Sequence, residues 1–388
     1  MTKQEEKKLY INRSISTTRV TSMKQISIVY INTERTWRGG ERQSFLLACE
    51  MRRRGHRVWV ACRHGFPLAK RCNEAGLPVF PIAPWIEAGL FTAWRLRRFL
   101  LQECVNVVQA ETGHAVGLGA LALLLGTPLS RVKFIGARRL EFPIKTHLLS
   151  QWKYSRLDRL VAISRRVKEV VQKGGVPISK ISLIHDGIDS SEYPDTKDRL
   201  RFRKERGFSE SDLLVVHAGA LSPEKDQSTL IFSAKQVCQE HPMARFLFLG
   251  DGPLRGELTA LVKELGLEQK VLFFGHRSDV LEWIAMADIF VLSSKKEAAG
   301  SVLLDALVLG IPTAATAAGG IPDFYGSDNA PELSAVGNPA ALAENILRVL
   351  NDSSESRRRI TRGKALATHF TLEIMADKYE TLYEKILL

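Results

Sequence analysis

The sequence predicts an α/β protein made of two doubly wound, Rossmann-like domains with a cleft between them. The 388 residues are 45% apolar and 25% charged, an ordinary globular composition at a length that favours two domains. Short apolar or β-branched runs alternate with longer segments of helical period, which is typical of parallel sheets covered by helices. The alternation stops at a polar stretch near the middle of the chain and then restarts.

The first 22 residues contain no continuous apolar run, so we do not interpret them as a secretory signal. Met23 then opens the sequence MKQISIVYIN, in which a charged residue precedes a strand-like run. We therefore expect residues 1–22 to be either a disordered arm or the product of an upstream start codon.

The first domain is expected over residues 23–188. Candidate helices include Glu41–Arg54, which Gly55 closes in the position favoured just past a helix end, and His114–Leu125. The candidate strands are Ile26–Ile31, Arg57–Cys62, Val79–Ile82, Val105–Gln109, Val132–Ile135, Leu160–Ile163 and Ile181–Ile184.

The second domain is expected over residues 189–371, and its first part, from Ser190 to Ser211, is a charge-dense linker. Sheets of this kind bind ligands beyond the carboxyl ends of their strands, so the interdomain cleft is the expected site. The candidate strands are Leu213–Ala218, Arg245–Leu249, Val271–Phe274, Ile289–Leu292 and Pro312–Ala315.

Composition argues against several other classes of protein. The five cysteines are scattered without a C-x-x-C pair, so neither a disulfide framework nor a structural metal is expected. The longest apolar run, Ala115 to Gly126, has about half the length of a bilayer crossing and is interpreted as a buried helix. A cytoplasmic protein without a transmembrane segment is the prediction.

Charge is distributed unevenly along the chain. Residues 1–180 carry 32 Lys and Arg against 12 Asp and Glu, whereas residues 181–388 carry 23 against 30. The first half therefore either faces an anionic partner or presents a merely solvated basic face. No nucleic-acid-binding motif accompanies it, so nucleic acid is not expected as a partner.

The segment Trp85–Gln102 mixes large apolar side chains with arginines. It is interpreted as a crossover helix that packs on the sheet, and the alternative is a basic amphipathic helix lying on an anionic membrane surface. The second interpretation allows peripheral contact with the inner face of the cytoplasmic membrane.

Two stretches carry residues suited to a phosphorylated ligand. Gly39 and Gly40 lie in a loop before the first helix, where they allow close backbone approach and positive φ, although a plain tight turn is the alternative. Glu297 follows the strand ending at Leu292, and Asp305 lies eight residues later in a helix that starts at Gly300 and Ser301. Amides of Gly300, Ser301 and Val302 can receive a diphosphate, while the two acids can accept from sugar hydroxyls or can be a solvated loop acid and a helix-start acid.

Candidate residues of the first domain follow its strands. His114 stands at a helix start in AETGH, where it is either catalytic or an ordinary surface histidine. Arg138 and Arg139 directly follow a strand and are expected to bind a phosphate or carboxylate of an acceptor.

In combination these stretches resemble the retaining glycosyltransferases of family 4, which have the GT-B fold. The likeness covers about Lys24 to Leu388, and its motifs occur in the family order. They are the Gly39-Gly40 loop, HDGID, AGALSPEKD, FLGDGPLR, FFGHRSDV, ADIFVLSS and the acidic pair Glu297 and Asp305.

The resemblance implies a nucleotide-diphosphate sugar as donor substrate, no metal and no cofactor. It implies that Gly39, Gly40 and the amides of Gly300 to Val302 approach the donor phosphates and that Lys225 neutralises the diphosphate. Glu297 would bind the donor sugar, Asp305 the ribose, and the loop around Arg277 would flank the base. Lys225, Glu297 and His114 are the implied catalytic residues, and helix 372–388 would return to the first domain.

Two positions depart from the family pattern. Asp305 stands where the family usually has Glu, and Ala220 stands where an arginine commonly precedes the PEK stretch, so Arg38 or Arg138 would have to supply that charge. The expected function is transfer of a sugar to an anionic acceptor. This acceptor is a cell-envelope glycan or a lipid-linked glycan, such as lipopolysaccharide. The alternatives are a nucleotide-sugar 2-epimerase and a non-catalytic protein that binds sugar nucleotides or polyanions.

Overall fold

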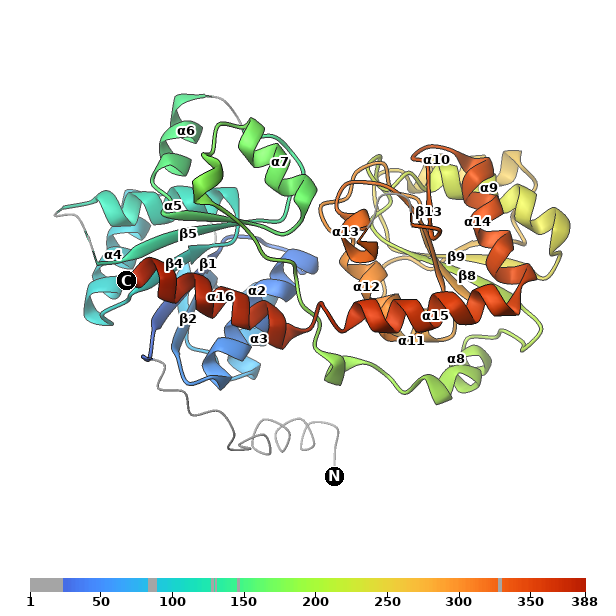
Figure 1. Cartoon of the computed structure of the whole chain (residues 1–388), viewed down its shortest axis with the longest axis horizontal. Helices are drawn as coiled ribbons and strands as arrows, with labels where there is room; N and C mark the ends of the chain where they lie inside the picture. The colour runs from blue at the N-terminus through green and yellow to red at the C-terminus, as the bar shows by residue number, and fades with distance from the viewer. Residues whose placement is uncertain (1–23, 83–88, 127–128, 130, 145–146, 327–329) are drawn as a thin grey trace.

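A computed structural model describes residues 24–82, 89–126, 129, 131–144, 147–326 and 330–388. The chain forms two parallel sheets, each covered by helices on both faces (Figure 1). The first sheet has the strand order β3-β2-β1-β4-β5-β6-β7 and the second β10-β9-β8-β11-β12-β13. This architecture confirms the predicted fold class. The predicted arm 1–22 and the start of the Trp85–Gln102 segment lie outside the described residues.

The strands follow the predicted runs closely, because each is a short stretch of buried apolar or β-branched residues. The first sheet contains β1 (Ser27–Asn32), β2 (Arg57–Arg63), β3 (Val79–Ile82), β4 (Val107–Ala110), β5 (Lys133–Arg138), β6 (Arg159–Ala162) and β7 (Ile181–Leu183). The second contains β8 (Leu213–Ala218), β9 (Ala244–Leu249), β10 (Val271–Phe273), β11 (Ile289–Leu292), β12 (Thr313–Thr316) and β13 (Leu333–Ser334). The two-residue strand β13 was not predicted, since so short a strand leaves no pattern.

The helices occupy the connections between the strands. Those around the first sheet are α2 (Gly39–Arg53), α3 (Pro67–Glu74), α4 (Leu90–Gln102), α5 (Gly113–Leu124), α6 (Leu148–Ser155) and α7 (Arg165–Lys173). Those that follow are α8 (Arg199–Glu205), α9 (Gln227–Glu240), α10 (Arg255–Glu264), α11 (Val280–Ala285), α12 (Ser301–Val308), α13 (Ile321–Tyr325), α14 (Pro339–Asn351), α15 (Ser353–Ala367) and α16 (Leu372–Leu387).

The structure corrects one local prediction and adds detail to another. Gly39 and Gly40 are the first residues of α2 and have ordinary negative φ, so positive φ is not the reason for glycine there. Within the predicted linker Ser190–Ser211, α8 forms and buries Phe202 and Arg203. Arg203 donates to the Met286 carbonyl oxygen at 3.0 Å and thereby fixes α8 to the second domain.

The last helix, α16, crosses back from the second domain and packs beside α2 on the first sheet (Figure 1). Its apolar face joins the core formed by β1, β2, α2 and α3. A buried polar contact adds direction to this packing: Glu380 meets His56 at 2.8 Å and contacts Arg54. The first sheet is therefore completed by the end of the chain.

Tyr383 of α16 reaches the centre of the first sheet. Tyr383 donates to the side-chain oxygen of Gln109 at 2.6 Å, and its hydroxyl lies 3.1 Å from that of Tyr30. All three side chains are fully buried. Burial raises the pKa of the Tyr383 and Tyr379 hydroxyls, so both stay protonated.

Replacing Tyr383 by Phe tests this anchor. The variant leaves the buried Gln109 oxygen without its donor, so we expect the free energy of unfolding to fall by about 1–3 kcal/mol. Urea unfolding followed by circular dichroism measures the change. The exposed Glu384→Gln on the same helix is the matched control, and equal stability of the two variants would contradict the anchoring role.

Candidate active site

Lys225 and Glu297 meet at the carboxyl ends of two neighbouring strands of the second sheet. Lys225 lies in the loop after β8 and Glu297 in the loop after β11, and the Lys225 ammonium contacts the Glu297 carboxylate. The Ser294 hydroxyl donates to the same carboxylate at 3.2 Å, and the Ser293 hydroxyl donates to the Lys225 carbonyl oxygen at 3.1 Å. The structure thus joins a cation and an acid that the sequence placed 72 residues apart.

Two glycines after β12 hold the loop that carries Glu297. The Gly320 N–H donates to the Glu297 carbonyl oxygen at 2.8 Å. A Cβ on Gly319, where φ is +55°, would lie 1.8 Å from that oxygen, and one on Gly320 would lie 2.3 Å from the Ala298 oxygen. Only glycine fits at both positions. The Gly-Gly pair after a strand was the available sequence signal, and our sequence analysis assigned it no role.

The first domain also contacts the Glu297 loop. Glu141, in the loop after β5, accepts a hydrogen bond from the Glu297 backbone N–H at 3.1 Å. Arg166 of α7 orients Glu141 with a hydrogen bond of 2.8 Å. The loop is therefore held from both sides of the cleft, by a residue that sequence reasoning missed.

The starts of α2 and α12 lie close together where the two domains meet. Gly300, at φ +80°, ends the Glu297 loop and turns the chain into α12. A Cβ on Gly39 would lie 3.3 Å from the Ser301 hydroxyl oxygen, so the two helix starts nearly touch. The first turn of a helix carries free N–H groups and the positive end of its dipole. Two such ends close together favour an anion beside them.

Asp305 is buried, and its partners include a tyrosine and an arginine. Its carboxylate accepts from the Tyr193 hydroxyl at 2.5 Å and from Arg42 of α2 at 3.3 Å. Burial and the adjacent Asp305 charge raise the pKa of Tyr193, which keeps that hydroxyl a donor. Asp305 therefore connects α12, α2 and the segment between the domains. Neither Arg42 nor Tyr193 was singled out from the sequence, because their link to Asp305 exists only in three dimensions.

Arg139 does not present an open fork to a ligand. Its guanidinium is buried, contacts the Glu111 carboxylate and lies 3.0 Å from that of Asp186. Burial acts to lower the pKa of Arg139, but the charges of Glu111 and Asp186 outweigh this effect and raise it well above its ordinary value. The side chain thus ties β5 to the loops after β4 and β7, and it also lines the first-domain cavity, so a role for Arg139 in acceptor binding stays a prediction.

Arg138 and His114 lie together in the wall of a cavity of about 700 Å³ in the first domain. Arg138 donates to the Phe142 carbonyl oxygen at 2.6 Å and to the Tyr154 hydroxyl at 3.3 Å. His114 is exposed in the first turn of α5. Gly40 and Arg38, at the start of α2, line the same cavity, which places it beside the gap between the two helix starts.

The remaining predicted residue, Arg277, has a partner in its own loop. Its guanidinium donates to both oxygens of Asp279 at 2.8 Å. Hydrogen bonding to Arg277, with help from Arg206, lowers the pKa of Asp279 and keeps it ionised. A role beside a nucleotide base stays a prediction.

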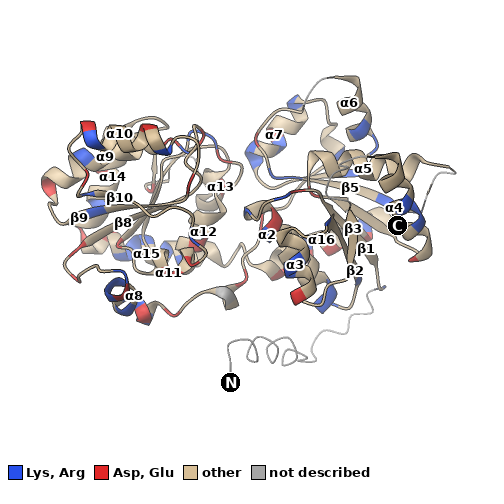
Figure 2. Ribbon diagram, turned by 180° about the vertical axis from the view of Figure 1, so that it is seen from behind, with Lys and Arg blue, Asp and Glu red and all other residues tan. Residues whose placement is uncertain are grey.

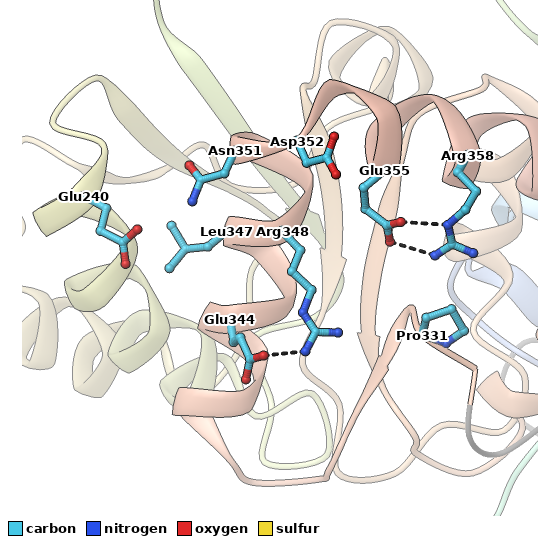
Figure 3. A pocket seen from close by; sticks show the side chains of 9 residues that line it. All are labelled: Glu240, Pro331, Glu344, Leu347, Arg348, Asn351, Asp352, Glu355 and Arg358. Carbon is cyan, nitrogen blue, oxygen red and sulfur yellow. Dashed lines mark hydrogen bonds and ion pairs between the residues drawn. The ribbon is translucent and has the colours of Figure 1, made fainter.

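A second hollow, of about 590 Å³, lies on α14 and α15, away from the carboxyl ends of the strands (Figure 3). Two of its arginines pair with neighbouring acids, Arg348 with Glu344 and Arg358 with Glu355. Because these charges satisfy one another, we assign the hollow no chemical role.

The described part of the chain contains no group of three or more His, Cys, Asp or Glu side chains arranged to hold a metal ion. Nor does any helix within it combine the length and apolar character that a bilayer crossing requires.

Comparison with known proteins identifies the family. Residues 37–192 match the model of Glycosyltransferase Family 4, and residues 198–365 match that of Glycosyl transferases group 1. The chain belongs to glycosyltransferase family 4. The first matched region ends at residue 192 and the second begins at residue 198, directly before α8.

Two curated relatives of this family 4 protein carry different names. It is 30% identical over 231 residues to N-acetyl-alpha-D-glucosaminyl L-malate synthase of Bacillus anthracis, covering 59% of this chain and 60% of that protein. It is 30% identical over 168 residues to the lipopolysaccharide core biosynthesis glycosyltransferase LpsE of Rhizobium meliloti, covering 43% and 48%. The match thus spans less than two thirds of the first curated relatives.

Solved structures share its fold. Anabaena Alr3699/HepE in complex with UDP aligns with a TM-score of 0.79 at 20% identity, covering 92% of this chain and 100% of that chain. The lipopolysaccharide outer core galactosyltransferase WaaB aligns with a TM-score of 0.68 at 16% identity, covering 93% and 100%. Both alignments cover more than nine tenths of this chain, so the similarity in fold includes both sheets.

A buried histidine beside Lys225 makes the stability of the site depend on pH. Burial lowers the pKa of His217 to about 4 from 6.5. The unfolded chain therefore binds a proton between these values that the folded protein does not, and the free energy of unfolding falls by about 3 kcal/mol as the pH drops through this window. Urea titrations of wild type and His217→Gln at about pH 7 and about pH 4.5 measure this slope.

We expect a shallower pH dependence for His217→Gln than for wild type. The exposed His276→Gln in the same domain is the control and should keep the wild-type slope. Identical slopes in all three proteins would show that His217 does not titrate in this way.

Proposed function

We propose that this protein transfers a sugar from a nucleoside-diphosphate donor to an acceptor in the cleft, with retention of the anomeric configuration. One observation carries the proposal: the Lys225–Glu297 pair lies on the domain whose α12 start lies close to that of α2. Amides there suit a diphosphate, a cation suits the negative charge that develops on its departure, and a carboxylate suits sugar hydroxyls.

The roles of the donor-binding residues follow from this arrangement. Amides at Gly39, Gly40 and Gly300 to Val302 bind the diphosphate, and Lys225 stabilises its charge. Glu297 accepts from the sugar hydroxyls and Asp305 from the ribose, while Arg277 flanks the base. The uridine diphosphate in the Alr3699/HepE structure makes uridine diphosphate sugars the first donors to test.

Retention requires the acceptor to attack the face from which the diphosphate leaves. In the proposed step the bond between the anomeric carbon and the phosphate oxygen breaks, and a bond to the acceptor oxygen forms. The acceptor hydroxyl proton passes to the departing phosphate oxygen. Lys225 and the helix-start amides hold the developing charge, and the step uses neither a metal nor a cofactor. Ala220 stands where the family commonly has an arginine. We assign the missing positive charge to Arg38, which directly precedes Gly39.

The acceptor is proposed to be an anionic cell-envelope glycan or lipid-linked glycan. LpsE and WaaB are named for lipopolysaccharide synthesis, which supports this class. The excess of Lys and Arg in the first half of the chain also favours an anionic acceptor; Figure 2 shows blue segments on α4, α6 and α7. His114, in the wall of the first-domain cavity, is proposed to contact the donor sugar or the acceptor.

Peripheral contact with the inner face of the cytoplasmic membrane is proposed for α4. This helix buries Leu96 and Leu100 against the core, as a crossover helix should, yet Leu90, Phe91 and Trp94 stay 67%, 64% and 45% exposed. The Arg98 guanidinium lies 5.0 Å from the centre of the Trp94 ring. Aromatic side chains beside cations suit the interface of an anionic bilayer.

Replacing Lys225 by Ala tests the transfer reaction. Because Lys225 meets charge that develops in the transition state, we expect turnover to fall by about a hundredfold or more. Thermal shifts with uridine, guanosine and adenosine diphosphate sugars first identify the donor, and acceptor-dependent release of nucleoside diphosphate then measures turnover.

The exposed Lys235→Ala on α9 is the matched control and should keep wild-type turnover. Near-normal turnover of Lys225→Ala would remove this lysine from the mechanism. Donor conversion without any acceptor would indicate a 2-epimerase, and donor binding without turnover across many acceptors would indicate a non-catalytic binding protein.

The double variant Phe91→Ser, Trp94→Ser tests the membrane contact. Loss of two exposed aromatic side chains should weaken binding to vesicles of phosphatidylglycerol and phosphatidylcholine by about tenfold or more in sedimentation assays. Phe232→Ser, at a 44% exposed position on α9, is the control. Equal sedimentation of both variants and the wild type would exclude α4 as the contact.

A further inference from the structure

One end of the first-domain cavity gathers donors from three separate elements. They are Arg138 at the end of β5, Lys153 and Tyr154 of α6, and the first turn of α5 with His114. The acids of the cavity, Glu34, Glu41 and Glu111, come from the loops after β1 and β4 and from α2. None of the cavity residues that α6 and the segment after Arg139 contribute is acidic, among those that the structure describes.

The donors converge on the start of α5. The Lys153 ammonium donates to the Gly113 carbonyl oxygen at 2.6 Å. A Cβ on Gly113 would lie 3.6 Å from the Tyr154 hydroxyl oxygen and 3.8 Å from the Lys153 nitrogen. Arg138 reaches the same hydroxyl at 3.3 Å. One small volume beside Gly113 is therefore within reach of an ammonium, a phenol and a guanidinium.

Among the described residues, Arg138 forms no ion pair with an acid. The hydrogen bonds of Arg138 given above go to a neutral carbonyl and a neutral hydroxyl, and within the described residues its buried Nε atom has no hydrogen-bond partner. Glu111 is engaged by Arg139, and Glu41 accepts from the Arg38 backbone N–H at 2.8 Å. Cations that are partly removed from water favour an anion nearby.

We propose that this end of the cavity binds an oxyanion, a phosphate or carboxylate group, carried by the acceptor. Lys153, Arg138 and Tyr154 are its ligands, and the free amides of the α5 start add a positive dipole end. The inference rests on the proposed function, because it assumes that the acceptor occupies this cavity beside the start of α2. It adds Lys153 and Tyr154 to the predicted acceptor residues Arg138 and Arg139.

Calorimetric titration with glycerol 1-phosphate, L-malate and neutral glycerol tests the oxyanion site. We expect both anions to bind the wild type, with an affinity that falls as salt increases, and glycerol not to bind. Lys153→Met should weaken binding of the anions by about tenfold or more, and Lys153→Arg should restore part of it. The exposed Lys173→Met on α7 is the matched control.

Competition with monomeric dihexanoyl phosphatidic acid distinguishes the two sources of the anion. Displacement of glycerol 1-phosphate by this lipid supports a lipid headgroup at the site, and binding of the soluble anions alone supports a small acidic acceptor. Anion binding that is unchanged in a folded Lys153→Met, or absent in the wild type, would overturn the inference.

The unfolding midpoint of each variant without ligand shows whether it is folded. If Lys153→Met does not fold, Tyr154→Phe replaces it and should also weaken binding of the anions. Nucleotide-sugar thermal shifts, which depend on the second domain, separate the two proposals. If a nucleotide sugar raises the melting temperature but no anion binds, only the oxyanion site is refuted. If no nucleotide sugar raises the melting temperature of the wild type, the proposed function is refuted.

Discussion

The close approach of two helix starts, α2 from the first domain and α12 from the second, is the constraint on which the site depends. Gly39 lacks a side chain where a Cβ would come 3.3 Å from the Ser301 hydroxyl oxygen. A larger residue at position 39 would require Ser301 or the start of α2 to shift, which would disturb the close approach of the two sets of amides. Everything proposed for the donor diphosphate follows from this contact, because amides bind an anion only when they point at one place.

Contacts elsewhere in the molecule keep the starts of α2 and α12 close together. Arg42 and Tyr193 connect α2 and the interdomain segment to Asp305 on α12. On the same face of the first sheet, α16 returns from the second domain, packs beside α2 and is anchored through Tyr383 in the centre of that sheet. A chain that crosses twice between its domains and pairs charges across them restricts their relative motion. The glycines after β12 then fix the Glu297 loop within this frame.

The fold was predictable because its signals are local. Each strand from β1 to β12 is a short buried run, and the predicted ranges agree with the observed ones within a few residues, whereas β13 has two residues and no pattern. The motif residues Lys225 and Glu297 were also predictable, and the structure brings them together. The pairing of Arg139 was not, because Glu111 and Asp186 come from other strand ends that only the folded sheet places beside it. The same reason hid Lys153, which lies on a helix and reaches α5 across the cavity.

The contact between Lys225 and Glu297 bears on how charge is handled in the proposed reaction. While the ammonium contacts the carboxylate, the pair has no net charge and its burial costs less than that of either group alone. An incoming diphosphate competes with Glu297 for the ammonium, and each carboxylate oxygen released in this exchange becomes an acceptor for a sugar hydroxyl. In the proposed reaction, donor binding therefore replaces the ion pair between Lys225 and Glu297 by an ion pair between Lys225 and the diphosphate. Such an exchange places the cation on the leaving group before any bond breaks, which is the arrangement that electrostatic stabilisation of the transition state requires.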